Sequence, residues 1–490
     1  MKQYISFPSL LFGLLLAGLW GCADDTNLPS EGSDNDGQGT LLTVNVVDNG
    51  YLASAGEAPT TRAQEEGYKT TFIAGDKIGL YVQSYYGDNT ENICLTLSAD
   101  GKWTPPAGTT LAYEGVKTTY YAYYPYQTDM TNKVRYGTNA DDFFMPLVKE
   151  WIPAADQSSY AKYTAQDLMI GKGTISGTPG STRTLTFTLS HRMALVLLDL
   201  PKAKYTLSND AGYTWLTDAL NTGFYGFSPY HLGAGAYRFL VNPWKTNLLF
   251  SGTYTDASAA PKEWELKPGI TAGKYKTYTV DNGAVVNNVS HVLQSGDFFM
   301  KDGSLLAASR TELNEEEQAN CIGIVFRIGT GSSDAVDNYE GKLTTIHGYV
   351  LALQQSWQTW GDGSRVFGTG TSGGAELGYK STQMIMAAAA SESRSFPACF
   401  YCVNYTPAPT GVTSGWYYPT TGQMRNCAIN ANSNGINTQL GKIPGAAIMS
   451  GTYSSSSETN AGQVWGARVG SGSYYYLGKG SNLTRAVLTF

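Results

Sequence analysis

Histidine and carboxylate side chains are spread along this chain without the spacing of a catalytic or metal site. The four histidines are far apart in the sequence: His191, His231, His291 and His347. Metal sites usually combine ligands at short, regular spacings, and the histidines show no such pattern. The Gly-rich runs at Thr369 to Gly374 and Gly470 to Ser481 lie in loop-like contexts without a following helix, so neither predicts a nucleophile elbow or a phosphate-binding loop. We therefore expect no catalytic residue, no metal and no cofactor, and we predict that the protein is not an enzyme.

Four aspartates in the last segment could form a nonstandard cation site, but we interpret them as hydrated loop carboxylates: Asp297, Asp302, Asp334 and Asp337. The same segment holds Cys321, Cys399, Cys402 and Cys427. In an exported protein, Cys321 or one member of the Cys399-x-x-Cys402 pair could form a disulfide with Cys427. Cys94 is interpreted as a small buried hydrophobe.

The N-terminus has the pattern of an exported lipoprotein. Lys2 supplies a positive charge, Leu10 to Leu19 form an apolar run, and Gly21 places a small residue before Cys22. This order resembles a bacterial lipobox, which predicts a signal peptide over residues 1–22 that is cut before Cys22, and a lipid on the Cys22 sulfur. Residues 23–39 would then tether the precursor to the outer membrane.

A strand, a loop with one arginine and a second strand follow the tether. Leu42, Val44 and Val46 alternate with polar or exposed positions, which predicts a strand with one buried face. The small, polar residues 50–61 keep Arg62 outside regular structure and open to a protease. Arg62 is also the only basic residue between Lys2 and Lys69. A cut between Arg62 and Ala63 would remove the first strand and leave an apolar groove that another strand could fill.

Composition indicates a mainly β protein. Of the 490 residues only 15% are charged, whereas the chain has 56 Gly, 34 Tyr and 10 Trp. The net charge of -7 and the lack of a basic stripe argue against nucleic acid as a partner. After the N-terminus no stretch is apolar and long enough to cross a bilayer.

The strand patterns divide the rest of the chain into three parts. Residues 40–200 are expected to form one β-sandwich, with an aromatic strand at Thr119 to Tyr126 and the clearest strand signal at Thr182 to Leu200. Residues 201–285 are expected to form a second, smaller sandwich with turns at Pro268-Gly269 and Ala272-Gly273. Residues 286–490 form the last part. We interpret most tyrosines as packing residues.

Three short motifs in this order resemble a known family. Thr61-Arg62-Ala63, GDKIGLYV at Gly75 to Val82 and TYYAYYPY at Thr119 to Tyr126 are similar to the fimbrillin-like pilins of outer-membrane fimbriae. The resemblance implies transthyretin-like β-sandwiches, a lipoprotein precursor, a cut by an Arg-specific protease, and assembly with other pilin subunits by strand exchange. A fimbrillin-like stalk subunit would end soon after the second sandwich, whereas this chain continues.

The last part resembles a C-type-lectin-like domain of α+β fold. The resemblance rests on the order of its segments, from Ser295 to Leu306 onward, and on Gly-Trp-Tyr-Tyr-Pro at Gly415 to Pro419. The calcium-binding triplets of C-type lectins are absent, so calcium-mediated sugar binding is not carried over. The closing strand at Ala486 to Phe490 is short and follows its domain without a linker, so we do not expect it to act as a donor strand.

These features together predict a fimbrial tip or minor pilin subunit that acts as an adhesin. Its receptor would be a glycan or a protein of host or microbial origin, bound at residues that the sequence does not identify. The alternative is a glycan-binding surface lipoprotein that does not polymerise. The two hypotheses differ in whether the chain is cut after Arg62.

Overall fold

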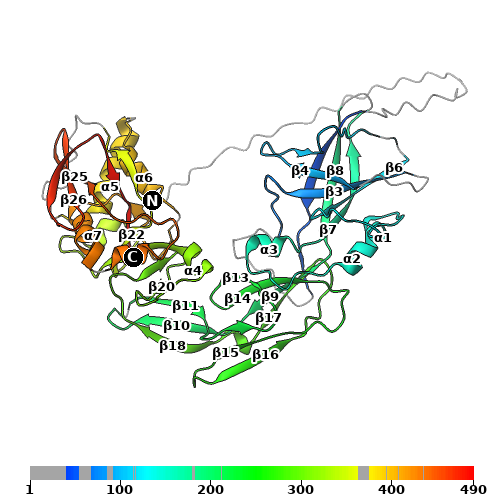
Figure 1. Cartoon of the computed structure of the whole chain (residues 1–490), viewed down its shortest axis with the longest axis horizontal. Coiled ribbons are helices and arrows are strands. Elements are labelled where there is room, and N and C mark those ends of the chain that lie inside the picture. The colour runs from blue at the N-terminus through cyan, green and yellow to red at the C-terminus, as the bar shows by residue number, and fades with distance from the viewer. Residues whose placement is uncertain are drawn as a thin grey trace, which may run out of the picture.

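The computed structural model describes residues 40–490, except 55–67, 85–91, 114, 116, 179–181, 211, 362–374, 393, 407 and 434. Cys22, the predicted tether, Arg62 and Ala63 lie outside the described residues. The predicted mainly β fold is confirmed: most elements are strands, with short helices between them. The chain forms a V, with a first domain on one arm, a middle domain at the base and a C-terminal domain on the other arm (Figure 1).

The first domain is built on one seven-stranded sheet. In spatial order its strands are β1 (Leu42–Asp48), β8 (Arg183–His191), β7 (Met169–Ser176), β6 (Thr118–Tyr124), β3 (Lys77–Ser84), β4 (Ile93–Leu97) and β5 (Trp103–Thr104). The sheet curls so that β5 approaches β1, and the enclosed core contains Leu80, Leu95, Phe187 and Leu189. The last strand thus helps to cover the first.

Three short helices cover the outer face of this sheet: α1 (Ala140–Phe143), α2 (Met145–Glu150) and α3 (Tyr160–Thr164). Tyr121 and Tyr123 of β6 pack against Phe143 and Phe144 on this side, whereas Tyr120 on the opposite face of β6 belongs to the enclosed core. Because both faces of β6 are covered, its tyrosines are packing residues, as the sequence analysis expected for most of them.

The middle domain is a two-sheet sandwich. Its five-stranded sheet has the order β13 (Tyr230–Gly233), β14 (Ala236–Val241), β9 (Ala194–Asp199), β17 (Lys274–Thr279) and β2 (Leu52–Ala53). The facing sheet contains β12 (Gly223–Phe224), β15 (Phe250–Thr255) and β16 (Pro261–Leu266). Val196, Phe239, Tyr254 and Trp264 pack between the two sheets. The chain therefore changes sheet between β8 and β9, before the expected boundary at residue 200.

A small sheet joins the middle domain to the C-terminal domain. It contains β11 (Thr214–Asp218), β10 (Lys202–Leu207) and β18 (Val285–His291), which follows the 3-10 turn η1 (Asp281–Gly283). Leu207, Tyr213, Trp215 and Leu293 share one hydrophobic core with residues of the C-terminal domain. Because this core crosses the junction, the two domains are packed together rather than linked by a free hinge.

The C-terminal domain combines two sheets with helices. One sheet has the order β20 (Leu305–Leu306), β19 (Phe298–Met300), β21 (Cys321–Ile328), β22 (Gly348–Ala352), β29 (Val487–Thr489) and β24 (Trp416–Tyr417). The other has the order β23 (Ser356–Thr359), β28 (Ser481–Thr484), β25 (Thr452–Asn460), β26 (Gln463–Arg468) and β27 (Tyr474–Gly478).

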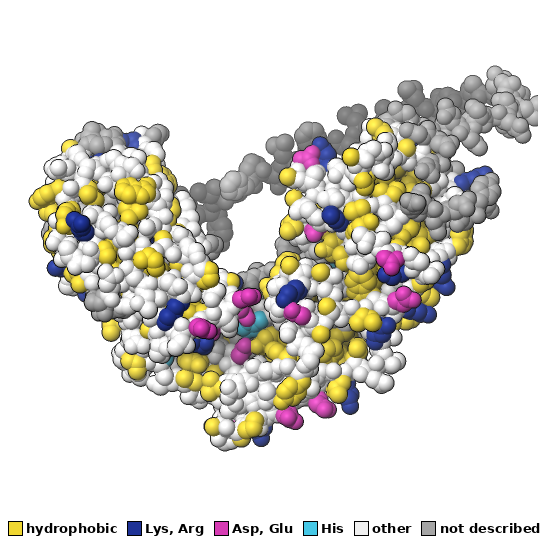
Figure 2. Space-filling view, in the orientation of Figure 1, with side chains coloured by type: hydrophobic (Ala, Val, Ile, Leu, Met, Phe, Trp, Pro, Cys, Tyr) yellow, Lys and Arg dark blue, Asp and Glu magenta, His cyan; other side chains and the backbone are white. Residues whose placement is uncertain are grey.

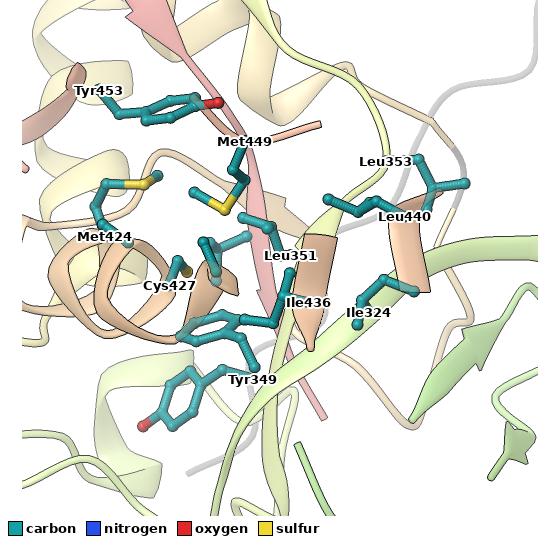
Figure 3. Close-up of a cluster of buried hydrophobic side chains, with 14 of the residues drawn as sticks. Ile324, Tyr349, Leu351, Leu353, Met424, Cys427, Ile436, Leu440, Met449 and Tyr453 are labelled. Carbon is teal, nitrogen blue, oxygen red and sulfur yellow. The ribbon is translucent and has the colours of Figure 1, made fainter. Parts of the chain in front are cut away.

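The helices of this domain are α4 (Glu315–Asn320), η2 (Val336–Tyr339), α5 (Gly378–Glu392), α6 (Pro397–Val403), α7 (Thr421–Ser433) and α8 (Ile436–Leu440). Figure 3 shows how Met424 and Cys427 of α7 pack against Leu351 of β22 and Tyr453 of β25. Among the described residues every cysteine is a free thiol, so the disulfides considered for Cys427 are not formed. No helix within the described ranges is long and apolar enough to cross a membrane.

Candidate functional site

The segment from Thr40 to Ser54 is held by both the first and the middle domain. β1 pairs in parallel with β8, in register from Leu42 opposite Arg183 to Asp48 opposite Leu189. After Asp48 the chain continues to Leu52, where β2 begins and pairs in parallel with β17 at the edge of the middle domain's sheet. In Figure 1 this segment is the dark blue strand beside β8, which continues toward β9 and β17. A single stretch of chain therefore completes two sheets.

Backbone hydrogen bonds hold this segment at both ends. On the side away from β8, the Leu42 N–H donates to the Leu111 carbonyl at 3.0 Å, and the Tyr113 N–H donates to the Thr40 carbonyl at 2.8 Å. In the middle domain the Leu52 N–H donates to the Gly273 carbonyl at 2.9 Å. Removal of the segment would leave the Leu111 and Gly273 carbonyls and the Tyr113 N–H without these partners.

The side chains of β1 alternate as the sequence predicted. Leu42, Val44 and Val46 are half-buried against the enclosed core of the first domain, whereas Thr43 and Asn45 are exposed. Tyr51 is 5% exposed and belongs to the core shared by the first sheet, its helices and the middle domain. The segment therefore contributes apolar surface to two separate cores.

The polar centre of the segment is an ion cluster around His191, the last residue of β8. Its Nε2 lies 2.8 Å from Asp48 Oδ1, and its Nδ1 lies 2.9 Å from Asp167 Oδ1. Asp48 also accepts hydrogen bonds from the N–H groups of Gly50 and Thr70. The Tyr51 ring stacks on the imidazole at 3.8 Å, and its hydroxyl donates to Asp167 at 2.7 Å.

The charges of this cluster stabilise each other. Burial would lower the pKa of His191, but the charges of Asp167 and Asp48 and their hydrogen bonds outweigh it and raise the pKa to about 9. Burial would raise the pKa of Asp48, but His191 and the two backbone N–H groups lower it overall. At neutral pH the cluster therefore contains an imidazolium ion facing a carboxylate from the N-terminal segment.

The C-terminal strand is held very differently. β29 lies inside its sheet, with β22 on one side and β24 on the other, and Val487, Leu488 and Phe490 are completely buried. The Phe490 carbonyl accepts hydrogen bonds from the N–H groups of His347 and Gly348. The Phe490 ring packs on Tyr213 and Phe299. These contacts fix the last residue of the chain in the core.

Arg485 anchors the approach to β29. It is fully buried, and its guanidinium donates to the carbonyls of Ala352 and Leu353 at 2.8 Å and to the Gln355 side chain at 3.3 Å. Burial lowers the pKa of Arg485 somewhat, although neighbouring groups oppose this effect. Withdrawal of the C-terminal strand would break these hydrogen bonds as well as the core of the domain.

A recess at the base of the V is lined by charged residues of the middle and C-terminal domains (Figure 2). His231 Nδ1 lies 2.5 Å from Glu316 Oε1 of α4, and its Nε2 lies 3.2 Å from Asp218 Oδ1. Burial would lower the pKa of His231, but the two carboxylates raise it to about 10. His347 contacts Asp210, which lies between β10 and β11 of the joining sheet, at 2.7 Å. These contacts help to hold the C-terminal domain against the rest of the chain.

The four loop aspartates bind the protein's own groups where the structure gives their contacts. Asp297 is fully buried and contacts His291, and Asp334 accepts a hydrogen bond from Tyr349 at 2.8 Å. Asp302 caps the turn at Ser304. Within the described part of the chain, no group of three or more His, Cys, Asp or Glu side chains is placed to hold a metal ion.

The sequence analysis identified the apolar residues of β1 but missed Asp48, Tyr51 and His191. The signal that could have found them is positional. Asp48 is the last residue of β1, and His191 is the last residue of β8. From the sequence alone, a charged residue at the end of each strand does not indicate an ion pair. Only the parallel register of β1 and β8 shows that the two residues lie close together.

Comparison with known proteins gives two independent matches. Residues 61–286 match the model of the family described as fimbrillin-like. A Bacteroides ovatus protein named as a fimbrium tip subunit, Fim1C, is 30% identical to this chain. The alignment covers 94% of this chain and 94% of that protein.

Solved structures align with lower similarity. A crystal structure of a fimbrial protein from Bacteroides ovatus is 26% identical, with coverage of 92% of this chain and 100% of that chain and a TM-score of 0.43. A structure from Bacteroides uniformis, described as a cell adhesion protein, is 16% identical over 53% of this chain and 94% of that chain, with a TM-score of 0.29.

Proposed function

Because this chain belongs to the fimbrillin-like family, as its 30% identity to a family relative over 94% of its length shows, we propose that it is a fimbrial tip subunit that accepts a strand from a neighbouring subunit. In this proposal, an Arg-specific protease cuts between Arg62 and Ala63, and the segment that carries β1 and β2 leaves. A strand of another pilin subunit then fills the groove.

The observation that carries this proposal is the position of the N-terminal segment. β1 is the first strand of its sheet and β2 is the edge strand of the middle domain's sheet, so both can leave without removing an interior strand. The matched family region also begins at Thr61, next to Arg62, and thus excludes both strands. Residues 40–54 are then an occupant of the groove rather than part of the domain that the family shares.

The tip position is supported by the C-terminus. A subunit inside the fibre must both accept a strand and donate one. β29 is interior and its side chains are fully buried, so its donation would unfold its own domain. The relative named as a tip subunit matches this chain over almost its full length, including the C-terminal domain. A subunit in which β29 stays in its own sheet would not donate this strand to a neighbour, as expected at the end of a fibre.

The export route and the binding role complete the proposal. Lipid attachment at Cys22 would hold the precursor at the outer membrane until the cut after Arg62 frees residues 63–490. The C-terminal domain, for which we propose a C-type-lectin-like fold, would then present its receptor-binding surface at the fibre end. The receptor is a glycan or a protein on a host or microbial cell.

The proposal is tested by the N-terminal sequence of subunits sheared from the cell surface. We expect the sequence to begin at Ala63. Arg62→Ala should retain the lipid-blocked precursor in the membrane fraction and remove the subunit from sheared fibres. Arg135→Ala, which alters a half-exposed arginine elsewhere in the first domain, is the matched control and should be processed normally. Sheared wild-type protein that still carries residues 23–62 would contradict strand removal and support the nonpolymerising lipoprotein instead.

A further inference from the structure

His191 lies where the removable segment meets the part of the chain that would remain. The side chain of His191 is 0% exposed and that of Asp48 is 2% exposed, at a separation of 2.8 Å. Asp167, the other carboxylate in contact with His191, lies downstream of Arg62 and would stay. Asp48 and Tyr51 lie upstream of Arg62 and would leave. The cut therefore divides one buried ion cluster into two parts.

The remaining part of the cluster is an anion site. The Asp48 carboxylate accepts from the Thr70 N–H and contacts the His191 ring, and both of these groups belong to the retained chain. A charge that is buried without its partner is strongly destabilising. After Asp48 leaves, His191 keeps only one of its two carboxylates, and the Thr70 N–H loses its acceptor. A new carboxylate at the same position would satisfy both groups.

We propose that His191 selects the incoming strand by requiring a carboxylate at the position that Asp48 occupies. This inference rests on the proposed strand replacement and adds the chemistry of the partner. The register defines the rest of that partner: apolar residues at the positions of Leu42, Val44 and Val46, and an aromatic ring at the position of Tyr51 to stack on the imidazole. The donor is a strand with three alternating apolar residues followed by an acidic residue and an aromatic residue.

Other residues at the acidic position fit this site less well. Lysine or arginine would place a positive charge against the buried imidazolium, where repulsion is weakly screened. Asparagine has a similar shape but would leave Asp167 as the one carboxylate in contact with the imidazolium. The hydrogen bond from Thr70 could form with either side chain, so the preference for a carboxylate comes from His191.

The natural occupant provides the probe for a test. Full-length protein without its signal peptide is cut after Arg62, and labelled peptides are offered as replacements for the released segment. The first peptide has the sequence of residues 40–54, and the second carries Asp48→Asn. A third carries both Asp48→Asn and Asn45→Asp, which restores the net charge at an exposed position of β1. Dissociation constants are measured for cut wild-type protein and for cut His191→Gln.

We expect the Asp48→Asn peptide to bind wild-type protein about ten- to hundredfold more weakly than the unchanged peptide. The peptide with the relocated carboxylate should be equally weak, and His191→Gln should bind all three peptides with similar affinity. Equal binding of the three peptides to wild-type protein would overturn the role of His191 while leaving strand replacement intact. Failure of even the unchanged peptide to enter the groove would overturn the strand replacement on which the inference rests.

Discussion

The first and last strands of this protein are both short and apolar, yet they are held in opposite ways. β1 has one full strand partner, β8, and its inward side chains are only half-buried. β29 lies between two strands, and its side chains are completely buried. On the proposed strand replacement, whether a strand can be exchanged would depend on its position in the sheet and on its burial rather than on its own sequence. The N-terminal strand would leave a formed domain, whereas removal of the C-terminal strand would disrupt the core of its domain.

The largest effect should come from deletion of Ala486 to Phe490. This change removes an interior strand and its fully buried side chains, so we expect the C-terminal domain to unfold while the first domain stays folded. Limited proteolysis with mass spectrometry would show rapid cleavage within residues 286–485 and protection of the first domain. Protection of both domains in the truncated protein would show that β29 is not required for the fold of its domain, contrary to the comparison with β1.

Loss of the N-terminal segment should have a smaller effect. Protein that is cut after Arg62 and freed of the segment loses the buried Tyr51 ring and three half-buried aliphatic side chains. We expect the first domain to lose about 5 kcal/mol of unfolding free energy without losing its fold. Calorimetry before and after addition of the 40–54 peptide would measure the loss and its recovery. Identical melting of the cut and uncut proteins would show that the segment is not part of either core.

Single substitutions sharpen the comparison. Leu488→Ala should lower the unfolding free energy of the C-terminal domain by about 2–5 kcal/mol, because it creates a cavity at a fully buried position. Val44→Ala should lower that of the first domain by about 1 kcal/mol, because the side chain is only half-buried. Denaturant titrations would give both values. Thr43→Ala, at an exposed position of β1, is the control and should change little.

The smallest effect should be the pH dependence of the junction between the middle and C-terminal domains. The pKa of His231 is raised in the folded protein to about 10, above its ordinary value of 6.5. Its stabilising charge is therefore fully present below about pH 6.5 and is lost as the pH rises through about 10. We expect the junction to weaken by about 1 kcal/mol over this range. Denaturant titrations at several pH values should show a smaller dependence for His231→Gln, and an unchanged slope would exclude this histidine as its source.

Much of the fold could be predicted because its signals are local. Alternation in Leu42 to Val46 and in Thr119 to Tyr126 specifies strands directly, and β1 and β6 lie where the patterns placed them. The end of β8 was harder to predict from the sequence. The run from Thr182 to Leu200 gives one continuous strand signal, but it contains β8 and β9, which join different sheets. Local patterns do not state which sheet a strand joins, because that choice depends on long-range pairing.

The candidate site was predictable to the same extent. The apolar face of β1 follows from its sequence alone. The ion cluster does not, because Asp48, Asp167 and His191 are distant in sequence and meet only through the pairing of β8 with β1 and with β7. In the same way, the buried hydrogen bonds of Arg485 depend on the path of residues 352–355, which the sequence does not reveal.

The span of the N-terminal segment across two sheets also has a mechanical consequence. Because β1 pairs with β8 and β2 pairs with β17, a strand that replaced both would bridge the bend between β8 and β9. Tension along such a strand loads its many ladder hydrogen bonds together in shear, instead of peeling them apart one at a time. A fibre that ends in this subunit would therefore carry traction through the two domains as one stiff unit, and the arm with the C-terminal domain would project from a fixed base.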